Sequence, residues 1–266
     1  MPLVCDVARG ITELSQALGA YHAPARWVEQ AAALNQNWQA TVQQITASPE
    51  ETSAKPSDAQ VIGAVQRTSH AGDIVVCAAG GLPGELHKLW QVRQTGGYHL
   101  EYGYSCMGYE IAGGLGVKMA EPERQVTVMV GDGSYMMMNS EIATSVAMGV
   151  KLVIVVLDNR GFGCINRLQA ATGGAAFNNL WQDSWQNGGV TIDFSAHARA
   201  MGAQSCHVDS IGALEQALIE ARHATTTQVI VIDTDPRRST DEGGHWWDVA
   251  VPEQSERNEV QKARKG

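Results

Sequence analysis

The sequence lacks the patterns that mark several common classes of protein. No stretch reaches the roughly 18 apolar residues that a membrane span requires, and the start, MPLVCDVARGITEL, has neither the basic region nor the apolar centre of a signal peptide. Lysine and arginine total 19 against 28 aspartate and glutamate residues, which gives a formal charge of −9 and no basic stripe. We therefore expect neither a membrane nor a nucleic acid among the partners.

Cysteine is scarce, and its positions form no pattern. No C-x-x-C pair occurs, so a metal-binding or redox pair of that type is not indicated. An odd number of scattered thiols is typical of a reducing compartment and predicts a cytoplasmic location. The five cysteines are Cys5, Cys77, Cys106, Cys164 and Cys206.

A dinucleotide-binding fingerprint is also missing. No G-x-G-x-x-G follows the first apolar strand, and no acidic residue lies at a suitable distance beyond it. These absences argue against an oxidoreductase that binds a nicotinamide dinucleotide.

The chain divides into parts of different composition. A short strand at Leu3–Val7 and helices at Ile11–Leu18 and Trp27–Thr46 have nothing of their own to pack against, and SPEETSAKPSD is a linker by composition. The tail finishes with the charged run SERNEVQKARKG, which we expect to be frayed at its end. The predicted parts are the remnant of a preceding middle domain or a docking arm (1–47), a linker (48–58), a ligand-binding domain (59–240) and a C-terminal tail (241–266).

Strands and helices alternate regularly through the third part. The strands are apolar throughout, which indicates burial on both faces, and their alternation with helices predicts an α/β fold with a doubly wound, mostly parallel sheet. Ligands of such sheets bind at the carboxyl ends of the strands. The predicted strands are 73–78, 125–130, 151–157, 203–208 and 228–233.

Two polar motifs follow neighbouring strands at these ends. Gly131-Asp132-Gly133-Ser134 follows one strand, and Asp158-Asn159-Arg160-Gly161 follows the next, with a helix between them. Carboxylate and amide oxygens suit a small divalent cation such as Mg²⁺, and glycines let backbone N–H groups approach a phosphate. Taken singly, Asp132 is also compatible with an ordinary turn and Asn159 with a helix cap.

A third motif is the glycine-rich stretch CAAGGLPGELHKLW. A strand, the loop Gly80-Gly81-Leu82-Pro83-Gly84 and a helix place backbone N–H groups where a phosphate can bind. The same pattern also occurs in simple strand-to-helix turns, so the loop alone does not decide between the two interpretations.

The segment QVTVMVGDGSYMMMNSEIATSVAMGVKLVIVVLDNRGFG resembles the cofactor-binding signature of thiamine-diphosphate enzymes. The resemblance implies Mg²⁺ held by the Asp132 carboxylate, the Asn159 side-chain oxygen and the Gly161 carbonyl. It implies the thiamine-diphosphate-binding fold and cofactor contacts through Gly80, Gly81, Leu82, Gly131, Gly133, Ser134, Asn159, Gly161 and Phe162. The family commonly has Asn-Asn where this chain has Asp158-Asn159, but the ligand is the second residue, so the departure matters little.

The segment EYGYSCMGYEIAGGLGVK resembles the part of these enzymes that passes under the cofactor. The resemblance implies that the Ser105 carbonyl accepts from the aminopyrimidine and that Met107 wedges the two rings into a bent form. A plain core role for Met107 is the alternative.

Within this superfamily, the Tyr-rich segment and the tail GGHWWDVAVPE are similar to the cyclic-dione hydrolases of myo-inositol catabolism. The resemblance implies cleavage of the C–C bond between two ring carbonyls, with 5-deoxyglucuronate as product. A polyhydroxylated ring needs hydrogen-bond donors and a stacking face. Candidate substrate contacts are His99, Tyr102, Tyr104, His245, Trp246 and Trp247, and a stretch with Asn178, Asn179 and Trp181 is a candidate cover for the cofactor.

Such enzymes also carry an N-terminal domain that binds the pyrimidine and supplies an activating glutamate. Glu101, Glu110 and Glu141 all lie in the diphosphate-binding half, so none fits that role and no catalytic residue is identified in this chain. We therefore expect a companion domain or chain, a homo-oligomer, and little turnover by this chain alone. The alternatives are an enzyme acting on 2-keto acids, similar to acetolactate synthase or a decarboxylase, and a non-catalytic cofactor-binding subunit.

Overall fold

The computed structural model describes residues 4–49, 54–184, 191–244 and 249–265. The chain divides into two compact units, Met1–Gln44 and Ile45–Gly266. The division predicted from the sequence, with boundaries after residues 47, 58 and 240, stays a prediction.

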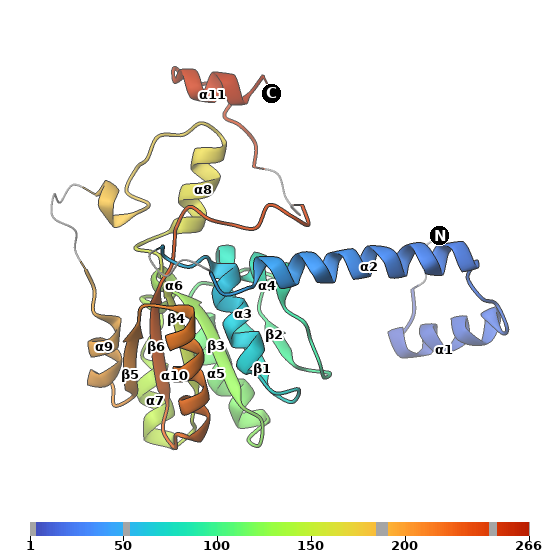
Figure 1. Ribbon diagram of the computed structural model, residues 1–266, viewed down its shortest axis with the longest axis horizontal. Coiled ribbons are helices and arrows are strands. Elements are labelled where there is room, and N and C mark those ends of the chain that lie inside the picture. The colour runs from blue at the N-terminus through green and yellow to red at the C-terminus, as the bar shows by residue number, and fades with distance from the viewer. Residues whose placement is uncertain (1–3, 50–53, 185–190, 245–248, 266) are drawn as a thin grey trace. The chain divides into compact units, whose positions relative to one another are not determined.

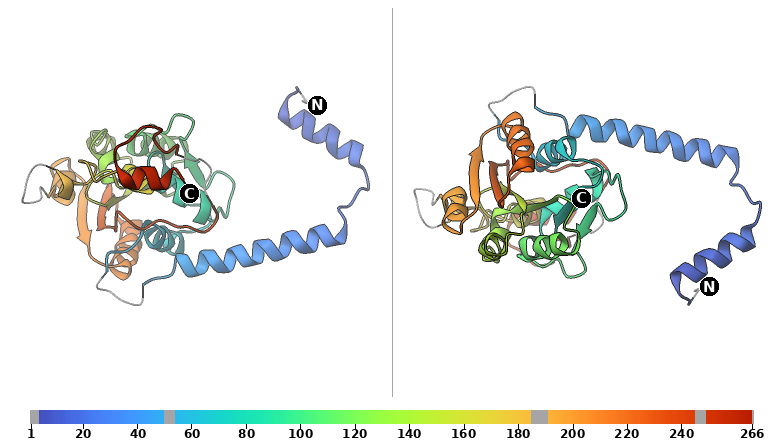
Figure 2. Two further views of the ribbon diagram at one scale, coloured as in Figure 1. Left: turned by 90° about the horizontal axis from the view of Figure 1, so that it is seen from above. Right: turned by 90° about the horizontal axis from the view of Figure 1, so that it is seen from below.

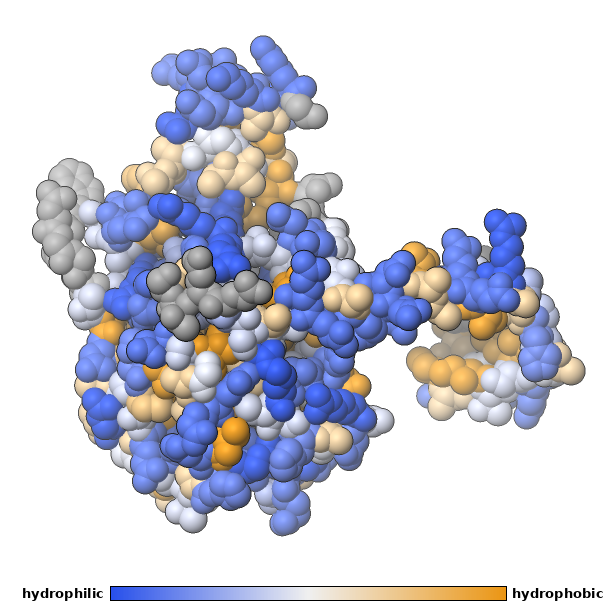
Figure 3. All heavy atoms as spheres, in the orientation of Figure 1, coloured by the Kyte–Doolittle hydropathy of each residue, from blue (hydrophilic) through white to orange (hydrophobic). Residues whose placement is uncertain are grey.

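The first unit contains helix α1 (Val7–Leu18) and most of helix α2 (Ala25–Ile45). The Asp6 side chain accepts a hydrogen bond from the backbone N–H of Arg9 at 3.0 Å and so caps α1. The predicted strand at Leu3–Val7 is therefore wrong in its described part, because Val7 is already the first helical residue. Apolar side chains gather on one side of α1, as Figure 3 shows.

The second unit is built on a six-stranded sheet, whose strands lie side by side across Figure 1. All of its strand pairs are parallel, and the strand order is β2-β1-β3-β4-β6-β5. The strands are β1 (Ile74–Cys77), β2 (Tyr98–Leu100), β3 (Val126–Gly131), β4 (Val153–Asp158), β5 (Gln204–Val208) and β6 (Gln228–Asp233).

Helices cover both faces of this sheet (Figures 1 and 2). Helix α3 packs against α4 and α10 on one face, and the core of the other face includes side chains from α5, α7 and α9. These elements confirm the predicted doubly wound α/β fold. The helices of the unit are α3 (Asp58–Thr68), α4 (Gly81–Leu89), α5 (Tyr109–Ala120), α6 (Asp132–Tyr135), α7 (Glu141–Met148), α8 (Gly163–Ala171), the 3-10 turn η1 (Trp181–Asp183), α9 (Phe194–Ala200), α10 (Ile211–His223) and α11 (Asn258–Ala263).

The central strands carry the core, as their unbroken apolar sequences predict. Every residue of β1 and β4 is buried, and so is every residue of β3 except Gly131. The register of β3 and β4 pairs Gly131 with Leu157. This pairing brings the loops that follow the two strands to the same level of the carboxyl edge.

Several elements were not predicted from the sequence. Strand β2 has only three half-buried residues and lies at the sheet edge, so it has no apolar run to reveal it. Helix α11 lies within the charged run at the end of the chain. Its Val260 is 5% exposed, and Arg257 at its start donates from Nε to the Gly173 carbonyl at 2.8 Å, which ties the helix to the end of α8.

Candidate cofactor site

Three loops meet in one pocket of about 310 Å³ at the carboxyl edge of the sheet. They follow β1, β3 and β4, which are neighbours in the sheet. Every residue that the sequence predicted to contact the cofactor lines this pocket, although the roles of these residues stay predictions. They are Gly80, Gly81, Leu82, Ser105, Met107, Gly131, Gly133, Ser134, Asn159, Gly161 and Phe162, together with the predicted metal ligand Asp132.

Two of the predicted metal ligands have a side-chain oxygen that lacks a hydrogen-bond partner among the described residues. They are Oδ1 of Asp132 and Oδ1 of Asn159, and both are buried. Oδ1 of Asp58, which also lines the pocket, is a third buried oxygen of this kind. The second carboxylate oxygen of Asp132 accepts from the Gly161 N–H at 2.7 Å. Buried oxygens without partners are rare in folded proteins, because each one forfeits its bonds to water. A bound cation would satisfy the oxygens of Asp132 and Asn159, so the residues fit the predicted metal site.

The charge on Asp132 supports the same conclusion. Asp132 is 1% exposed, and burial followed by the negative charge of Asp158 raises its pKa to about 7. The N–H groups of Gly161 and Gly133 act in the opposite direction but do not offset burial. An ionised carboxylate here needs a positive partner, which a divalent cation would supply.

Backbone constraints explain two of the glycines. Gly161 has φ of 139°, and a Cβ on it would lie 2.4 Å from the Asn179 carbonyl oxygen. A Cβ on Gly133 would lie 2.8 Å from the ring of Phe162. The loops after β3 and β4 therefore approach each other more closely than side chains allow.

Asp158 faces away from the pocket and towards Arg160. Its Oδ1 accepts from the Arg160 N–H at 3.0 Å, and its Oδ2 lies 3.3 Å from Arg160 Nε. Arg160 also bonds Asp233 on β6 at 3.0 Å and has a left-handed φ of 64°. Asp158 therefore holds the loop in shape, and the adjacent Asn159 is the residue that enters the pocket.

Glu110 joins three segments that line the site, a role that the sequence did not suggest. It is 1% exposed and accepts from the Ala79 N–H at 3.1 Å, the Gly108 N–H at 3.0 Å and the Ser134 hydroxyl at 2.7 and 2.8 Å. These donors belong to the loop after β1, the segment before α5 and the loop after β3. Because the Ser134 hydroxyl already donates to Glu110, the predicted hydrogen bond from Ser134 to a diphosphate would come from its backbone N–H.

The segment before α5 is held in a strained conformation. Ser105 has a left-handed φ of 53°, which is uncommon for a residue other than glycine. The Glu101 carboxylate accepts from the N–H groups of Tyr104 and Cys106 at 3.0 and 2.9 Å, and these bonds lower its pKa. Met107, 37% exposed, lies beside Gly133. The sequence placed Ser105 and Met107 under the cofactor, and strain at such a position is typical of functional sites.

Asp58 and Arg167 also line the pocket, although neither was singled out from the sequence. A Cβ on Gly81 would lie 2.5 Å from Arg167 Nη2, so the guanidinium lies close to the glycine-rich loop. Burial raises the pKa of Asp58 to about 6, while the charge of Arg167 acts to lower it. Asp58 is the first residue of α3, and a helix that precedes a strand begins at the carboxyl edge. This position at the start of a helix could have identified Asp58 as a pocket residue, but the sequence analysis placed it in the linker 48–58.

The candidate substrate residues are scattered. Tyr102 lines the pocket, and burial raises its pKa to about 12. His99 lies on β2, where its Nε2 is 2.8 Å from the Tyr109 hydroxyl, and Tyr104 is 91% exposed; neither lines the pocket. His245, Trp246 and Trp247 lie outside the described residues.

The stretch predicted to cover the cofactor packs against the loop after β4. The Asn179 carbonyl accepts from the Phe162 N–H at 2.7 Å, and the Trp181 N–H donates to Arg160 at 3.0 Å. Asn178 has a left-handed φ of 51°, as tight turns require. These bonds tie residues 178–181 to the loop that carries Asn159.

Other metal or membrane features are missing from the part of the chain that the structure describes. No group of three or more His, Cys, Asp and Glu side chains there could hold a metal ion. The predicted metal site does not meet this criterion, because Asp132 is its only ligand of these four residue types. Within the same ranges, no helix has the length and apolar character needed to cross a bilayer.

The fold and the site define a class of protein. A parallel sheet presents glycine-rich loops and the buried, unpartnered oxygens of Asp132 and Asn159 at its carboxyl edge, which suits a cation and a diphosphate-bearing ligand. Residues 78–234 match the thiamine pyrophosphate enzyme family through its C-terminal TPP binding domain. The chain belongs to this family, and thiamine pyrophosphate, also called thiamine diphosphate, is the cofactor of the domain.

Similar proteins narrow the relationship. The chain is 44% identical over 209 residues to 3D-(3,5/4)-trihydroxycyclohexane-1,2-dione hydrolase of Bacillus cereus (strain AH820). The aligned region covers 76% of this chain and 32% of that protein. The protein of the same name from Geobacillus thermodenitrificans (strain NG80-2) is 42% identical, with 76% and 33% covered. The chain thus spans about a third of the length of these relatives.

A solved structure shows the same fold. The thiamine diphosphate-dependent 4-hydroxybenzoylformate decarboxylase of Rhodococcus jostii RHA1 superposes with a TM-score of 0.63 at 20% identity. The match covers 71% of this chain and 34% of that protein. At this identity the likeness supports the fold and not the reaction.

Proposed function

We propose that this chain is the cofactor-binding part of a thiamine-diphosphate-dependent hydrolase that opens 3D-(3,5/4)-trihydroxycyclohexane-1,2-dione to 5-deoxyglucuronate in myo-inositol catabolism. The observation that carries the proposal is the pair of unpartnered buried oxygens, on Asp132 and Asn159, in the pocket between the glycine-rich loops. The named relatives at 42–44% identity give the substrate class. Five free cysteines agree with a cytoplasmic setting.

In this proposal the loops after β3 and β4 hold Mg²⁺ and the diphosphate. The Asp132 carboxylate, the Asn159 side-chain oxygen and the Gly161 carbonyl bind the cation. The backbone N–H groups of Gly81 and Ser134 face the diphosphate, and Arg167 adds a positive charge beside Gly81. When bound, thiamine diphosphate supplies the electron sink for cleaving a C–C bond next to a carbonyl.

The segment before α5 orients the cofactor rings. Met107 supplies an apolar wedge, and the Ser105 carbonyl accepts from the aminopyrimidine. Glu110 fixes both relative to the diphosphate loops through its bonds to Gly108 and Ser134. Tyr102 is the candidate for substrate contact that lines the pocket.

The remaining chemistry requires a partner. No described residue of the pocket fits the role of the activating glutamate, and the relatives are about three times as long as the matched region. We propose that an N-terminal pyrimidine-binding domain or a companion chain completes the site, and that the enzyme is a homo-oligomer.

Calorimetric titration tests the cofactor site directly. The purified chain is titrated with thiamine diphosphate, with and without Mg²⁺, and the titrations are repeated with Asp132→Ala and with Asp209→Ala as a control remote from the pocket lining. Binding that requires both Mg²⁺ and Asp132 supports the site. Equal affinity with and without Mg²⁺, or in Asp132→Ala, contradicts it.

A product assay tests the substrate. The chain, combined with the N-terminal part of the Bacillus cereus relative, is given either the cyclic dione named above or pyruvate, at saturating cofactor and Mg²⁺. Release of 5-deoxyglucuronate from the dione alone supports the hydrolase. Conversion of pyruvate alone identifies a 2-keto-acid enzyme, and cofactor binding without any turnover identifies a non-catalytic subunit.

A further inference from the structure

Arg167 extends from helix α8 to the glycine-rich loop after β1. A Cβ on Gly81 would lie 2.5 Å from Arg167 Nη2 and 3.7 Å from its Cζ, so the guanidinium lies directly against the backbone of the loop. Among the described residues that line the cofactor pocket, Arg167 is the sole lysine, arginine or histidine. The positive charge that the chain itself brings to this pocket is therefore concentrated beside Gly81.

The guanidinium is fixed on one side and open on the other. Its Nη1 donates to the Pro236 carbonyl at 2.8 Å, on the segment that follows β6. Its Nη2 makes no hydrogen bond within the described ranges, and it is not shut off from solvent. Because the guanidinium is planar and rigid, the bond of Nη1 also sets the direction of Nη2. An anion in the pocket can therefore reach a donor that is already oriented.

The charge of Arg167 is not neutralised by a carboxylate. Asp58 lines the same pocket, and the charge of Arg167 acts to lower its pKa, which burial raises to about 6. The two side chains nevertheless form no ion pair, and Arg167 forms none with any other residue that the structure describes. The carbonyl bond orients the guanidinium and leaves its charge available to a ligand.

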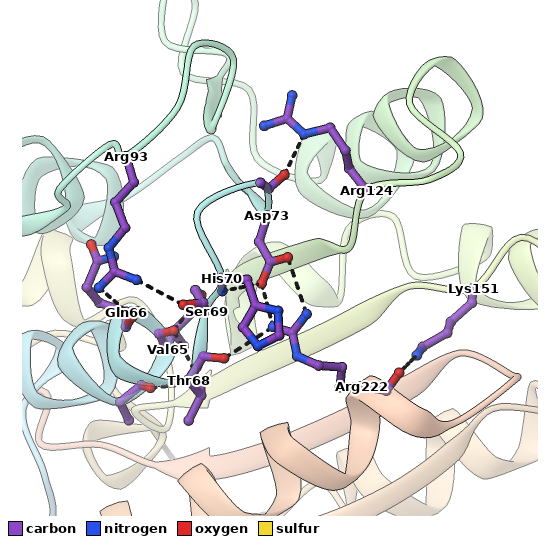
Figure 4. A network of polar contacts seen from close by, with 12 residues as sticks. Val65, Gln66, Thr68, Ser69, His70, Asp73, Arg93, Arg124, Lys151 and Arg222 are labelled. Atoms are coloured by element: carbon purple, nitrogen blue, oxygen red, sulfur yellow. Dashed lines mark hydrogen bonds and ion pairs between the residues drawn. The ribbon is translucent and has the colours of Figure 1, made fainter.

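The basic side chains at the amino ends of the strands differ from Arg167 in this respect. Figure 4 shows Arg124 and Lys151 there, well apart and pointing in different directions. Arg222 pairs with Asp73 at 2.5 and 3.3 Å, and Lys151 donates to the Arg222 carbonyl at 2.9 Å. These groups serve contacts within the protein, whereas Arg167 has an open donor at the edge where the cofactor loops meet.

The loop beside Arg167 supplies donors of its own. Helix α4 begins at Gly81, and no side chain caps its first turn. The N–H groups of a first turn have no partner within their helix and need an acceptor. The loop, Gly80-Gly81-Leu82-Pro83-Gly84, has no polar side chain that could supply one. A phosphate beside Gly81 would accept from the backbone and from Arg167 together.

The positions of the proposed ring contacts indicate which phosphate this is. Met107, the proposed wedge between the rings, lies beside Gly133 on the loop after β3. Arg167 lies beside Gly81 on the loop after β1. Because the rings and Arg167 contact different loops, the phosphate that reaches Arg167 is the one farther from the rings.

We infer that Arg167 binds the terminal phosphate of thiamine diphosphate and makes the site select the diphosphate over the monophosphate ester. The inference rests on the function proposed above, in which the loops after β3 and β4 hold Mg²⁺. A diphosphate carries more negative charge than a monophosphate, and one charge of the cation is already offset by Asp132. Arg167 supplies positive charge at the other end, through a charge-assisted hydrogen bond of the kind that arginine commonly makes to phosphate.

The test is calorimetric titration of the purified chain with thiamine diphosphate and with thiamine monophosphate, both at saturating Mg²⁺. The variant is Arg167→Met, and Arg26→Met is the control that removes the same charge from an exposed position on α2. We expect Arg167→Met to weaken diphosphate binding by about ten-fold or more, as loss of a hydrogen bond between charged groups should. Monophosphate binding should change much less, and Arg26→Met should bind both esters like the parent chain.

A double-mutant cycle tests the position of the guanidinium. Gly81→Ala keeps the charge of Arg167 but places a Cβ 2.5 Å from Nη2, so the guanidinium must move. We expect Gly81→Ala to weaken diphosphate binding in the parent chain and to add little in the Arg167→Met background. Gly116→Ala on α5, where a Cβ meets nothing within 4 Å, is the control. Fully additive losses would overturn the placement of Arg167 at the terminal phosphate.

If Arg167→Met fails to fold, chemical modification of the parent chain decides. Phenylglyoxal modifies accessible arginines, and mass spectrometry of the digested chain locates them. Thiamine diphosphate with Mg²⁺ should protect Arg167 and leave Arg26 reactive, and the monophosphate should protect Arg167 less. Equal modification of Arg167 with and without thiamine diphosphate would overturn the inference.

The titrations separate this inference from the function on which it rests. If Arg167→Met binds the diphosphate like the parent chain, or loses equal affinity for both esters, the role of Arg167 is overturned while Mg²⁺-dependent binding by the parent chain still supports the cofactor site. If the parent chain shows no Mg²⁺-dependent binding of thiamine diphosphate, the proposed function is contradicted and the inference with it.

Discussion

Glu110 is the residue whose contacts join the loops after β1 and β3 to the segment before α5. Its two carboxylate oxygens each accept from a different backbone N–H, those of Ala79 and Gly108. A glutamine has only one acceptor oxygen, so one of these N–H groups would face an amide nitrogen. The shape of the site therefore depends on a carboxyl group that we do not expect to contact the cofactor.

We predict that Glu110→Gln destabilises the chain by about 1–3 kcal/mol, the usual cost of a buried donor left unpaired, and weakens thiamine diphosphate binding. Chemical unfolding and calorimetric titration measure the two effects. Glu121→Gln, at the exposed end of the same helix, is the control. An unchanged affinity in Glu110→Gln would show that the loops hold their positions without it.

Asp58 predicts a pH dependence of stability. Its pKa in the folded chain, about 6, lies above the ordinary value of 3.8 because the group is buried. A raised pKa means that the protonated form favours folding, so this contribution is complete below about pH 4 and is lost as the pH rises through 6. The shift corresponds to at most about 3 kcal/mol at neutral pH.

Asp58→Asn should remove this dependence. We predict that the variant is more stable than the parent chain at pH 7 and that the difference narrows towards pH 4. Urea unfolding across this range measures it, and the difference between the chains isolates Asp58 from other buried carboxyl groups. A difference that stays constant with pH would contradict the assignment.

At the scale of elements, residues 178–181 and the loop after β4 act as a pair. The isolated bridge between Gly161 and Leu180, with the bond from the Phe162 N–H to Asn179, joins them. Leu180 is 2% exposed, so the pair is anchored in the core. The loop after β4 thus depends on a segment about 20 residues further along the chain.

We predict that Gly161→Ala separates this pair. A Cβ at φ of 139° and 2.4 Å from the Asn179 carbonyl oxygen requires the backbone to move, at a cost of order 1–3 kcal/mol. Thermal unfolding should show the loss, and Mg²⁺-dependent cofactor binding should fall with it. Gly212→Ala in α10, where a Cβ meets nothing within 4 Å, should leave both unchanged or raise stability slightly.

The sequence predicted the elements that have strong periodic signals. Strands β3 and β4 and the loops after them were predicted correctly, because a strand that is buried on both faces has an unbroken run of apolar residues. Strand β2 and helix α11 were missed, since tertiary contacts such as the Val260 anchor stabilise them. Asp58, Glu110 and Arg167 were missed for a related reason: their roles arise from partners far away in the sequence.

At the scale of the whole molecule, the chain spans about a third of its named relatives. The lining of the described pocket includes the loops proposed to bind the diphosphate, and it includes no glutamate. We predict that the chain alone hydrolyses the cyclic dione at a rate near background and that adding the pyrimidine-binding part of a relative raises both the affinity for thiamine diphosphate and the turnover. Robust turnover by the chain alone would falsify this dependence.

The register of the sheet has a practical consequence. Gly131 of β3 pairs with Leu157 of β4. Asp132 comes directly after Gly131, and Asn159 comes two residues after Leu157, so the pairing sets the positions of both. A slip of one residue between β3 and β4 would turn their side chains to opposite faces and leave no cation site. Titrating a preparation with thiamine diphosphate and Mg²⁺ would therefore count the molecules whose central strands have paired correctly, and it could serve as an assay of refolding yield.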